Sequence, residues 1–345
     1  MAAMTMFPHV RKLPALVLLA LSGACCAQTA GPLVGFGDNT WGQLNVPTGN
    51  FIAVAGLAVT AAGIRADGTL IAWGDPDPQE LNVPTGTFKA IDAGSNHYLA
   101  IRTNDTLAAW GYNFFGEASV PPGTFRKVSA GDKHSLGIRT DGSIAYWGFS
   151  WGGVIPSGND FVDVAAGLEF SAALRSNGTI EEWGSGAPGI PAGGPFVAIA
   201  AGHHFLAALG SDRLIRSAGS GPNLGSLAST PVVSMVTAQF AILALKPDGT
   251  LAASASLATI TPNGLYLGIG AGATDSFFAI AGSPCYANCD HSSMPPVLNA
   301  NDFQCFLSLF ATSSLSANCD GSTNTPTLTA NDFQCFLNKF AGGCS

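Results

Sequence analysis

Short apolar segments alternate with glycine turns along residues 33–283, and the pattern recurs about every 36 residues. In one unit, apolar segments at 125–129 and 135–139 precede an Asp141-Gly142 turn and a third segment at 143–147. Glycine accepts a positive φ, so Asp-Gly between two apolar segments favours a tight β-hairpin. Regular turns without helical periodicity predict three short strands per unit and an all-β array.

Two registers count the units. In the first, an aromatic residue precedes glycine; in the second, a small residue does. The first register comprises Phe36, Trp73, Trp110, Trp147, Trp183 and weaker positions at Ala218 and near Ser254. The second comprises Ala55, Ala93, Ala130, Ala166, Ala201, Val236 and Ala271. Both registers give seven units, and because one small unit cannot bury both faces of its own sheet, we predict that seven stack radially into a ring.

The two ends of the repeat region complement each other. Residues 33–37 supply an aromatic-glycine strand with no preceding strands, and residues 271–280 supply the preceding strands with no aromatic-glycine strand. Together they complete one blade. We therefore predict a seven-bladed β-propeller over residues 28–283, closed by N- and C-terminal strands that share a blade.

Residues 1–27 have the pattern of an export signal. Arg11 and Lys12 precede a short apolar run at 13–21, and small residues follow, with cleavage after either Ala24 or Ala27. The run is too short to span a bilayer. A lipid anchor on Cys25 is the alternative interpretation. We expect a secreted or cell-surface protein without a membrane span.

Charge argues against nucleic-acid binding. The net charge is −8, and removal of the signal with its two basic residues leaves about −10, which repels phosphate backbones. Charged residues make up only 10% of the chain, against about 25% in ordinary soluble domains.

The unit pattern Ala-Gly-x-x-His-x-x-Ala-Ile/Leu-Arg-x-x-Gly-Thr-x-x-x-Trp-Gly-x-Asn-x-x-Gly resembles the regulator-of-chromosome-condensation repeat. It is similar to the secreted branch of that family, which includes a bacterial β-lactamase-inhibitor propeller. The resemblance implies a seven-bladed propeller. It does not imply nucleotide exchange on a small GTPase, because that activity belongs to nuclear members.

Aromatic residues recur in the loops that follow the aromatic-glycine step, at one topological position of the repeat. They are Trp41, Tyr112, Phe114, Phe115, Phe149 and Trp151. We expect these loops to lie on one rim of the ring, where exposed aromatic residues are typical of a protein- or glycan-binding site. The alternative is that the aromatic side chains only seal neighbouring loops against each other.

Other polar and aromatic residues in the repeat fit a structural role. His97 and His134 lie three residues after the small-residue-glycine step, where other units place Val59, Phe170, Phe205, Phe240 and Asp275. Replacement by apolar residues favours packing for these histidines. The recurring tryptophans are expected to pack between blades. His203 and His204 are adjacent, but no carboxylate or thiol has the spacing of a metal site with them.

The propeller region contains no nucleophile elbow, zincin motif, phosphate loop or dinucleotide fingerprint. We therefore expect a binding protein rather than an enzyme. Glu80 and Glu117 share one rim register, and Glu181 and Glu182 are further carboxylates, so a glycosidase-like acid pair is the alternative. A third interpretation, an inhibitor of a secreted enzyme, rests on the family resemblance alone.

Residues 284–345 contain a tandem repeat of about 30 residues. Each copy has an oxygen-rich loop followed by apolar residues at helical spacing, Phe303, Phe306, Leu307 and Phe310 in the first copy. Six cysteines lie here: Cys285, Cys289, Cys305, Cys319, Cys335 and Cys344. We predict a small α-helical, disulfide-stapled module of two loop-helix units, in which 289–305, 319–335 and 285–344 is one of many possible pairings.

This duplicated module resembles a dockerin, which implies calcium in its loops and a cohesin-like anchoring partner. The implied ligands in the first loop are Asn288, Asp290, Ser292, Asn299 and Asp302. Those in the second loop are Asn318, Asp320, Ser322, Thr329 and Asp332. The implied partner-docking residues are Ala300, Asn301, Ala330 and Asn331. The loops are longer than an EF-hand loop and poor in carboxylates, so weak binding, or disulfides in place of calcium, are both open.

Overall fold

The computed structural model describes residues 30–75, 78–254, 257, 261–272 and 276–282, all within one compact unit, Ala27–Cys285. The predicted export signal and the predicted loop-helix module lie outside the described residues, together with the calcium ligands, cysteines and docking residues expected there. Asp275 also lies outside them. Within the described part, no helix combines the length and apolar character needed to cross a membrane.

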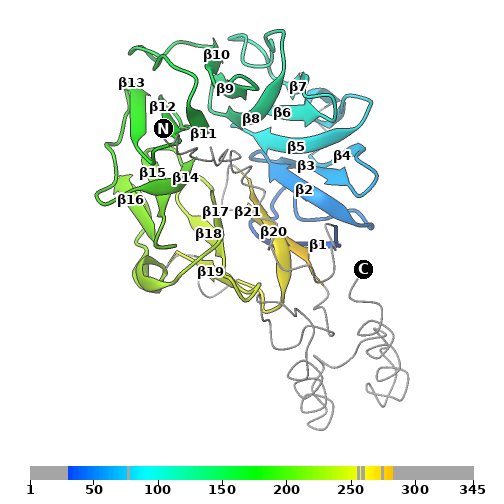
Figure 1. Cartoon of the computed structure of the whole chain (residues 1–345). Coiled ribbons are helices and arrows are strands. Elements are labelled where there is room, and N and C mark those ends of the chain that lie inside the picture. The colour runs from blue at the N-terminus through cyan, green and yellow to red at the C-terminus, as the bar shows by residue number, and fades with distance from the viewer. Residues whose placement is uncertain (1–29, 76–77, 255–256, 258–260, 273–275, 283–345) are drawn as a thin grey trace, which may run out of the picture. The chain divides into compact units, whose positions relative to one another are not determined.

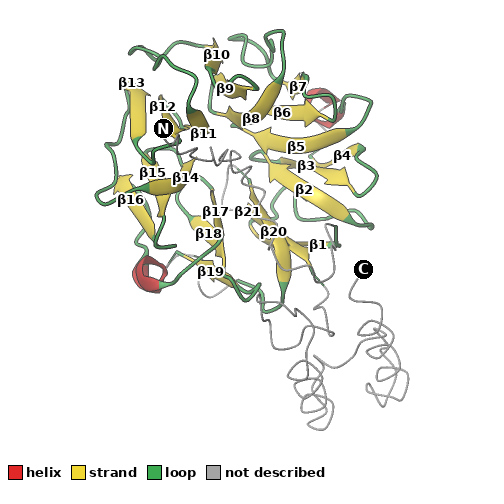
Figure 2. Ribbon diagram, in the orientation of Figure 1, coloured by secondary structure: helices red, strands yellow, loops and turns green. Residues whose placement is uncertain are grey.

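The described residues form seven antiparallel sheets of three strands each, the blades, drawn in Figures 1 and 2. Blade 1 is β2 (Phe51–Gly56), β3 (Thr60–Arg65) and β4 (Leu70–Gly74); blade 2 is β5 (Phe88–Ala93), β6 (His97–Arg102) and β7 (Leu107–Gly111); blade 3 is β8 (Phe125–Ala130), β9 (His134–Arg139) and β10 (Ile144–Gly148); blade 4 is β11 (Phe161–Ala166), β12 (Phe170–Arg175) and β13 (Ile180–Gly184). Blade 5 is β14 (Phe196–Ala201), β15 (Phe205–Gly210) and β16 (Ile215–Gly219); blade 6 is β17 (Ser234–Thr237), β18 (Ile242–Leu245) and β19 (Leu251–Ala253); blade 7 is β20 (Tyr266–Ala271), β21 (Ser276–Ala281) and β1 (Leu33–Gly37). Two short helices, α1 (Pro78–Leu81) and the 3-10 helix η1 (Gly225–Ser229), lie between blades.

The blades close into a ring, as the sequence predicts. Consecutive inner strands contact one another from β2 and β5 through to β20, and β20 also contacts β2. Strand β1 pairs with β21, with Leu33 opposite Ile280 and Gly37 opposite Ser276. The prediction that strands from both ends of the repeat region share one blade is confirmed, and this pairing completes blade 7.

Apolar side chains fill the spaces between blades. The inner strand of each of the first four blades begins with a fully buried phenylalanine, and the pairing register shifts after it. These residues are Phe51, Phe88, Phe125 and Phe161. The four tryptophans of the first register are also buried, and Trp73 of blade 1 contacts Phe278 of blade 7 edge to face. The predicted packing of the tryptophans between blades is confirmed.

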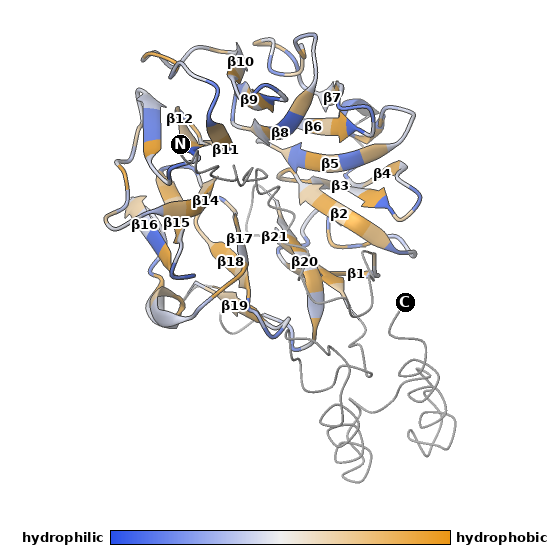
Figure 3. Ribbon diagram, viewed as in Figure 1, coloured by the Kyte–Doolittle hydropathy of each residue, from blue (hydrophilic) through white to orange (hydrophobic). Residues whose placement is uncertain are grey.

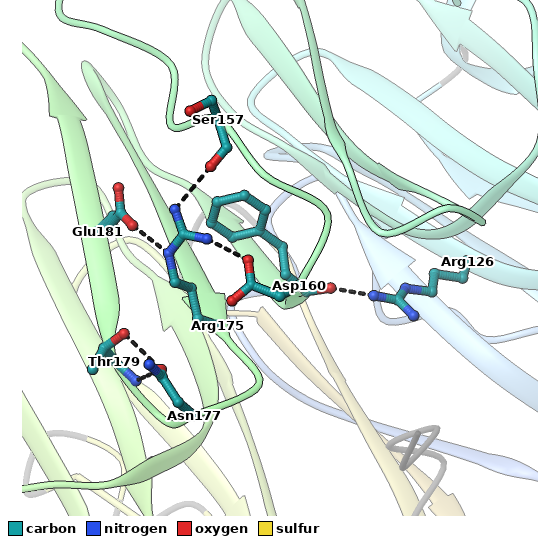
Figure 4. A network of polar contacts seen from close by, with 8 residues as sticks. Arg126, Ser157, Asp160, Arg175, Asn177, Thr179 and Glu181 are labelled. Atoms are coloured by element: carbon teal, nitrogen blue, oxygen red, sulfur yellow. Dashed lines mark hydrogen bonds and ion pairs between the residues drawn. The ribbon is translucent and has the colours of Figure 1, made fainter. Parts of the chain in front are cut away.

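In blades 1 to 4, an arginine at the end of the middle strand holds the Pro-Gly corner, the turn that precedes the inner strand of the same blade, as at Pro47-Thr48-Gly49 in blade 1. The Arg102 guanidinium lies 4.7 Å from the Phe88 ring centroid and donates a hydrogen bond of 2.7 Å to the Thr85 carbonyl. Arg65, Arg139 and Arg175 repeat this arrangement. Figure 4 shows the blade 4 example, in which Arg175 also pairs with Asp160 and Glu181. The Ile/Leu-Arg step of the repeat therefore fixes the turn between blades.

In blade 5, the arginine beside the corner comes from a different strand. Gly210 stands at the end of β15, where the arginine is found in blades 1 to 4. Arg216 on the neighbouring β16 fills the vacated space: a Cβ on Gly210 would lie 2.4 Å from its Nη1. Arg216 also lies against the corner glycine Gly193 and pairs with Asp212 at 2.6 Å.

Candidate functional site: an aromatic rim

Each rim loop leaves its blade at a position that only glycine can occupy. Gly111 and Gly148 end β7 and β10 with φ of 94° and 92°. A Cβ on Gly148 would lie 2.6 Å from the Lys133 carbonyl oxygen. Positive φ and close backbone approach both require glycine here, so the loop turns sharply outward after each outer strand.

Side chains within each loop fix its shape. In the loop after blade 2, Asn113 Oδ1 accepts a hydrogen bond from Ala118 N at 2.9 Å, and Glu117 Oε2 accepts one from Phe115 N at 2.7 Å. The loop after β1, which is the outer strand of blade 7, repeats both contacts, with Asn39 and Gln43 in place of Asn113 and Glu117. The aromatic side chains therefore project from an internally braced turn.

Four of the six expected rim aromatics lie together, and we call them the rim aromatic cluster: Phe114, Phe115, Phe149 and Trp151. Their neighbouring ring centroids are 5.0, 5.4 and 4.7 Å apart in that order, at interplanar angles of 83°, 78° and 63°. Phe114 is 86% exposed, Phe149 39% and Phe115 36%. Trp41 and Tyr112 are exposed as well, but they take no part in the ring contacts found among the described residues. The cluster joins the loop after blade 2 to the loop after blade 3.

A lysine that sequence analysis missed belongs to this cluster. Lys133 Nζ lies 5.3 Å from the Phe115 ring centroid and 5.6 Å from that of Trp151. The Lys133 carbonyl accepts a hydrogen bond from Phe149 N at 2.8 Å, which ties the turn between β8 and β9 to the loop after blade 3. Lys133 lies in the short turn before β9, outside the loops that carry the rim aromatic residues, so the repeat pattern does not single it out.

The rim carboxylates do not form an exposed acid pair. Glu80 and Glu117 are both buried; Glu80 Oε2 accepts a hydrogen bond from Thr60 Oγ1 at 2.7 Å. Glu181 pairs with Arg175. Burial raises the pKa of Glu182. Glu80 thus turns inward toward β3 and Glu117 toward its own loop, which is an arrangement unlike the open carboxylate pair of a glycosidase.

A family model described as the regulator of chromosome condensation (RCC1) repeat matches residues 88–117, which span blade 2 and its rim loop. No curated protein sequence matches the chain. Among solved structures, human WBSCR16 has a TM-score of 0.61 at 14% identity, covering 73% of this chain and all of that chain. Prp20p from Saccharomyces cerevisiae has a TM-score of 0.60 at 12% identity, covering 75% of this chain and 94% of its own. The ectodomain of the Physcomitrella patens receptor kinase CR4 has a TM-score of 0.55 at 20% identity, covering 64% and 67%.

The described residues form an RCC1-like repeat propeller. Below the rim of this RCC1-like propeller, one buried position joins each blade to the next. His97 Nε2 lies 2.7 Å from Ser135 Oγ of the following blade, and His134 Nε2 lies 3.0 Å from Ser171 Oγ. Burial lowers the pKa of His97 to about 3 and that of His134 to about 4, so both are neutral at pH 7.

The predicted equivalents of these histidines are wrong by one residue in three blades. In blade 7, Ser276 rather than Asp275 holds the position, because Ser276 pairs with Gly37 as His97 pairs with Gly111. Leu57 N donates to Thr60 O as Gly94 N donates to His97 O, so Thr60 rather than Val59 holds the position in blade 1. In blade 6 it is Ala241, which is buried, whereas Phe240 is 49% exposed and lies 5.9 Å from His203. Among the described residues, no group of three potential metal ligands exists.

The inner strands also carry a row of charged side chains that the sequence analysis did not identify. Lys127 Nζ lies 2.6 Å from Asp163 Oδ1, and Asp92 Oδ2 accepts a hydrogen bond from Ala130 N of the next blade at 2.9 Å. Figure 3 shows the polar bands on β5 and β8, which carry Asp92 and Lys127. Burial raises the pKa of Asp92 to about 6. Burial disfavours the charged form of Lys127, but Asp163 and Asp92 outweigh it and raise the pKa of this lysine.

Proposed function

We propose that this RCC1-like propeller is an exported, non-catalytic binding protein that engages a protein or glycan through the rim aromatic cluster. In this proposal the segment 284–345 anchors the protein to a cell-surface or scaffold partner. The signal pattern at residues 1–27 supports export, and so does the similarity of the repeat to the secreted branch of its family.

The observation that supports binding at the rim is the exposure of adjoining aromatic side chains. Phe114 has no structural need for its 86% exposure, because a braced turn already holds its backbone. Contiguous exposed aromatic residues on a soluble protein mark interaction sites, and such residues supply most of the free energy of binding at interfaces.

Propellers of the same fold act in binding. Prp20p was solved together with a study of its binding to Gsp1p and histones, and yeast RCC1 has been solved bound to Kap60. Similar propellers form the ectodomains of plant receptor kinases. These cases favour a binding role for this chain. The ectodomains show that a propeller of this fold can also lie outside the cell.

Affinity capture from the secreted proteins and glycans of the source cells tests the rim. The full chain is compared with the double variant Phe114→Ala/Phe149→Ala. Ile190→Ala is the matched control, because Ile190 is also exposed and apolar but follows blade 4. We expect the double variant to lose its captured partner and the control to keep it. Equal capture by both variants would refute binding at the rim.

The dockerin-like segment is tested separately. We propose weak calcium binding by the two loops and attachment to a cohesin-like partner, on the sequence resemblance described above. Deletion of residues 285–345 should release the protein from the cell surface, and Asp302→Asn with Asp332→Asn should abolish heat exchange in calorimetric calcium titration of the full chain. Unchanged surface retention after the deletion excludes the tether.

A further inference from the structure

The rim aromatic cluster already holds a cation of its own. The ammonium group of Lys133 faces the rings of Phe115 and Trp151, and its ion pair with Asp132 is long, at 3.6 Å. Aromatic faces attract cations. Because Lys133 occupies that place, an incoming lysine or arginine side chain meets a like charge there, whereas a carboxylate meets an ammonium group that is still partly exposed.

The shape of the cluster favours a protein over a sugar. Adjacent rings meet edge to face, so the surface is stepped, and a pyranose ring stacks on a flat, open aromatic face. The loop after blade 3 continues with Val154 and Ile155, two exposed aliphatic side chains that offer a sugar no hydrogen bond. Bulky apolar side chains fit both features, since they fill the steps between the rings.

We infer that the rim aromatic cluster binds a protein segment in which an acidic side chain lies next to bulky apolar side chains. This inference rests on the proposed function and names the partner's chemistry. The carboxylate of the partner pairs with Lys133, and its apolar side chains pack against Phe114 and Phe149. Fully desolvated aromatic contacts supply affinity, and the lysine selects the sign of the partner's charge.

A random peptide library displayed on phage, selected on the immobilised full chain, tests this inference. We expect the wild type to enrich peptides with Asp or Glu beside Phe, Leu or Trp. Lys133→Glu should reverse the preference to Lys and Arg. Lys89→Glu is the matched control: it makes the same change in net charge at an exposed lysine that pairs with Asp105, away from the rim, and it should leave the acidic preference intact.

The best acidic peptide is then synthesised for titration. Lys133→Met should weaken its binding about 3- to 10-fold and Lys133→Glu more than about 10-fold, and both differences should shrink at high salt, because salt screens the charge pair. Peptides without an acidic excess, or an acidic preference that survives Lys133→Glu, overturn the inference.

Oligosaccharide binding and the double variant separate this inference from the proposed function. Binding of cellulose or chitin oligosaccharides that is lost in Phe114→Ala/Phe149→Ala, with no peptide enrichment, keeps the rim as the binding site and overturns the acidic protein partner. Enrichment or oligosaccharide binding that is unchanged in that double variant overturns both, and so does a complete lack of binding to either class of ligand.

Discussion

The imidazole of His134 in blade 3 meets the hydroxyl of Ser171 in blade 4, with 3.0 Å between Nε2 and Oγ, and both side chains are buried. At the next junction the same two positions hold Phe170 and Leu206, which share one apolar cluster. The propeller thus joins adjacent blades by two different chemistries at one position. A polar pair and an apolar pair of similar size serve the same purpose.

Replacing the polar pair by the apolar one should remove acid sensitivity. The folded-state pKa of His134, about 4, lies below the unfolded value of about 6.5, so its contribution is complete above pH 6.5 and is lost as pH falls toward 4. The double variant His134→Phe/Ser171→Leu should therefore lose about 3 kcal/mol less free energy of unfolding than the wild type between pH 7 and pH 4.

Urea unfolding at both pH values measures this difference. Ser171→Leu alone is the control, because it retains the histidine and should remain acid-sensitive. Identical losses in the wild type and the double variant would show that His134 does not titrate on unfolding.

The arginine of blade 5 should be movable to the position it occupies in the other blades. Arg216→Ala removes the guanidinium from the Gly193 corner and from Asp212, and we expect a lower free energy of unfolding than in the wild type. Gly210→Arg alone should also destabilise, because a side chain there collides with Arg216. The double variant Gly210→Arg/Arg216→Ala should regain most of the loss.

A double-mutant cycle on thermal or urea unfolding tests this exchange. The coupling energy should be favourable and of the order of 1 kcal/mol. Additive losses would mean that Arg216 does not replace the missing arginine. In blade 1, Ile71 holds the position of Arg216 and Arg65 already holds the corner. Ile71→Arg should therefore bring no gain in the free energy of unfolding.

The sequence predicts the ring and its closure because the aromatic-glycine step marks the same strand in blade after blade. It misplaces the buried joint at Val59 because Gly56 stands in the strand pairing where Ala93 stands in blade 2, so that the Ala-Gly step comes one residue earlier. It misplaces the joint at Phe240 because Val236-Thr237 replaces the small-residue-glycine step in blade 6. A repeat register read from glycines alone does not record these shifts.

The rim shows the same division. The positions of Phe114 and Phe149 follow from the repeat, and the ring contacts agree with the expectation that such loops lie together. Lys133 comes from a different connection, between β8 and β9, and reaches the rings through its long side chain. Contacts that depend on the reach of one side chain across a junction are tertiary, and no local pattern records them.

Asp92 should contribute more to the free energy of unfolding in acid than at neutral pH. Burial raises its folded-state pKa from 3.8 to about 6, so its favourable contribution is present below pH 4 and is lost as pH rises through 6. Asp92→Asn keeps an acceptor for Ala130 N without the charge. Relative to the wild type, this variant should gain about 3 kcal/mol of unfolding free energy between pH 4 and pH 7.

The comparison cancels the histidines, which titrate alike in both proteins. Unfolding free energies measured from pH 4 to pH 7 should diverge through pH 5 to 6. Parallel curves for the two proteins would show that Asp92 is ionised in the folded state as readily as in the unfolded chain.

Glu117 should act as the brace of the rim rather than as an acid. Its carboxylate accepts the hydrogen bond from Phe115 N, and in the loop after β1 the amide oxygen of Gln43 does the same for Trp41 N. Glu117→Gln should therefore leave the unfolding free energy and the rim unchanged, whereas Glu117→Ala should cost about 1–2 kcal/mol, because the Phe115 amide loses its acceptor.

Hydrogen exchange at the Phe115 amide measures the difference directly: it should stay slow in Glu117→Gln and become fast in Glu117→Ala. Equal protection in both variants would contradict the bracing role, and loss of protection in Glu117→Gln would show that the negative charge is required.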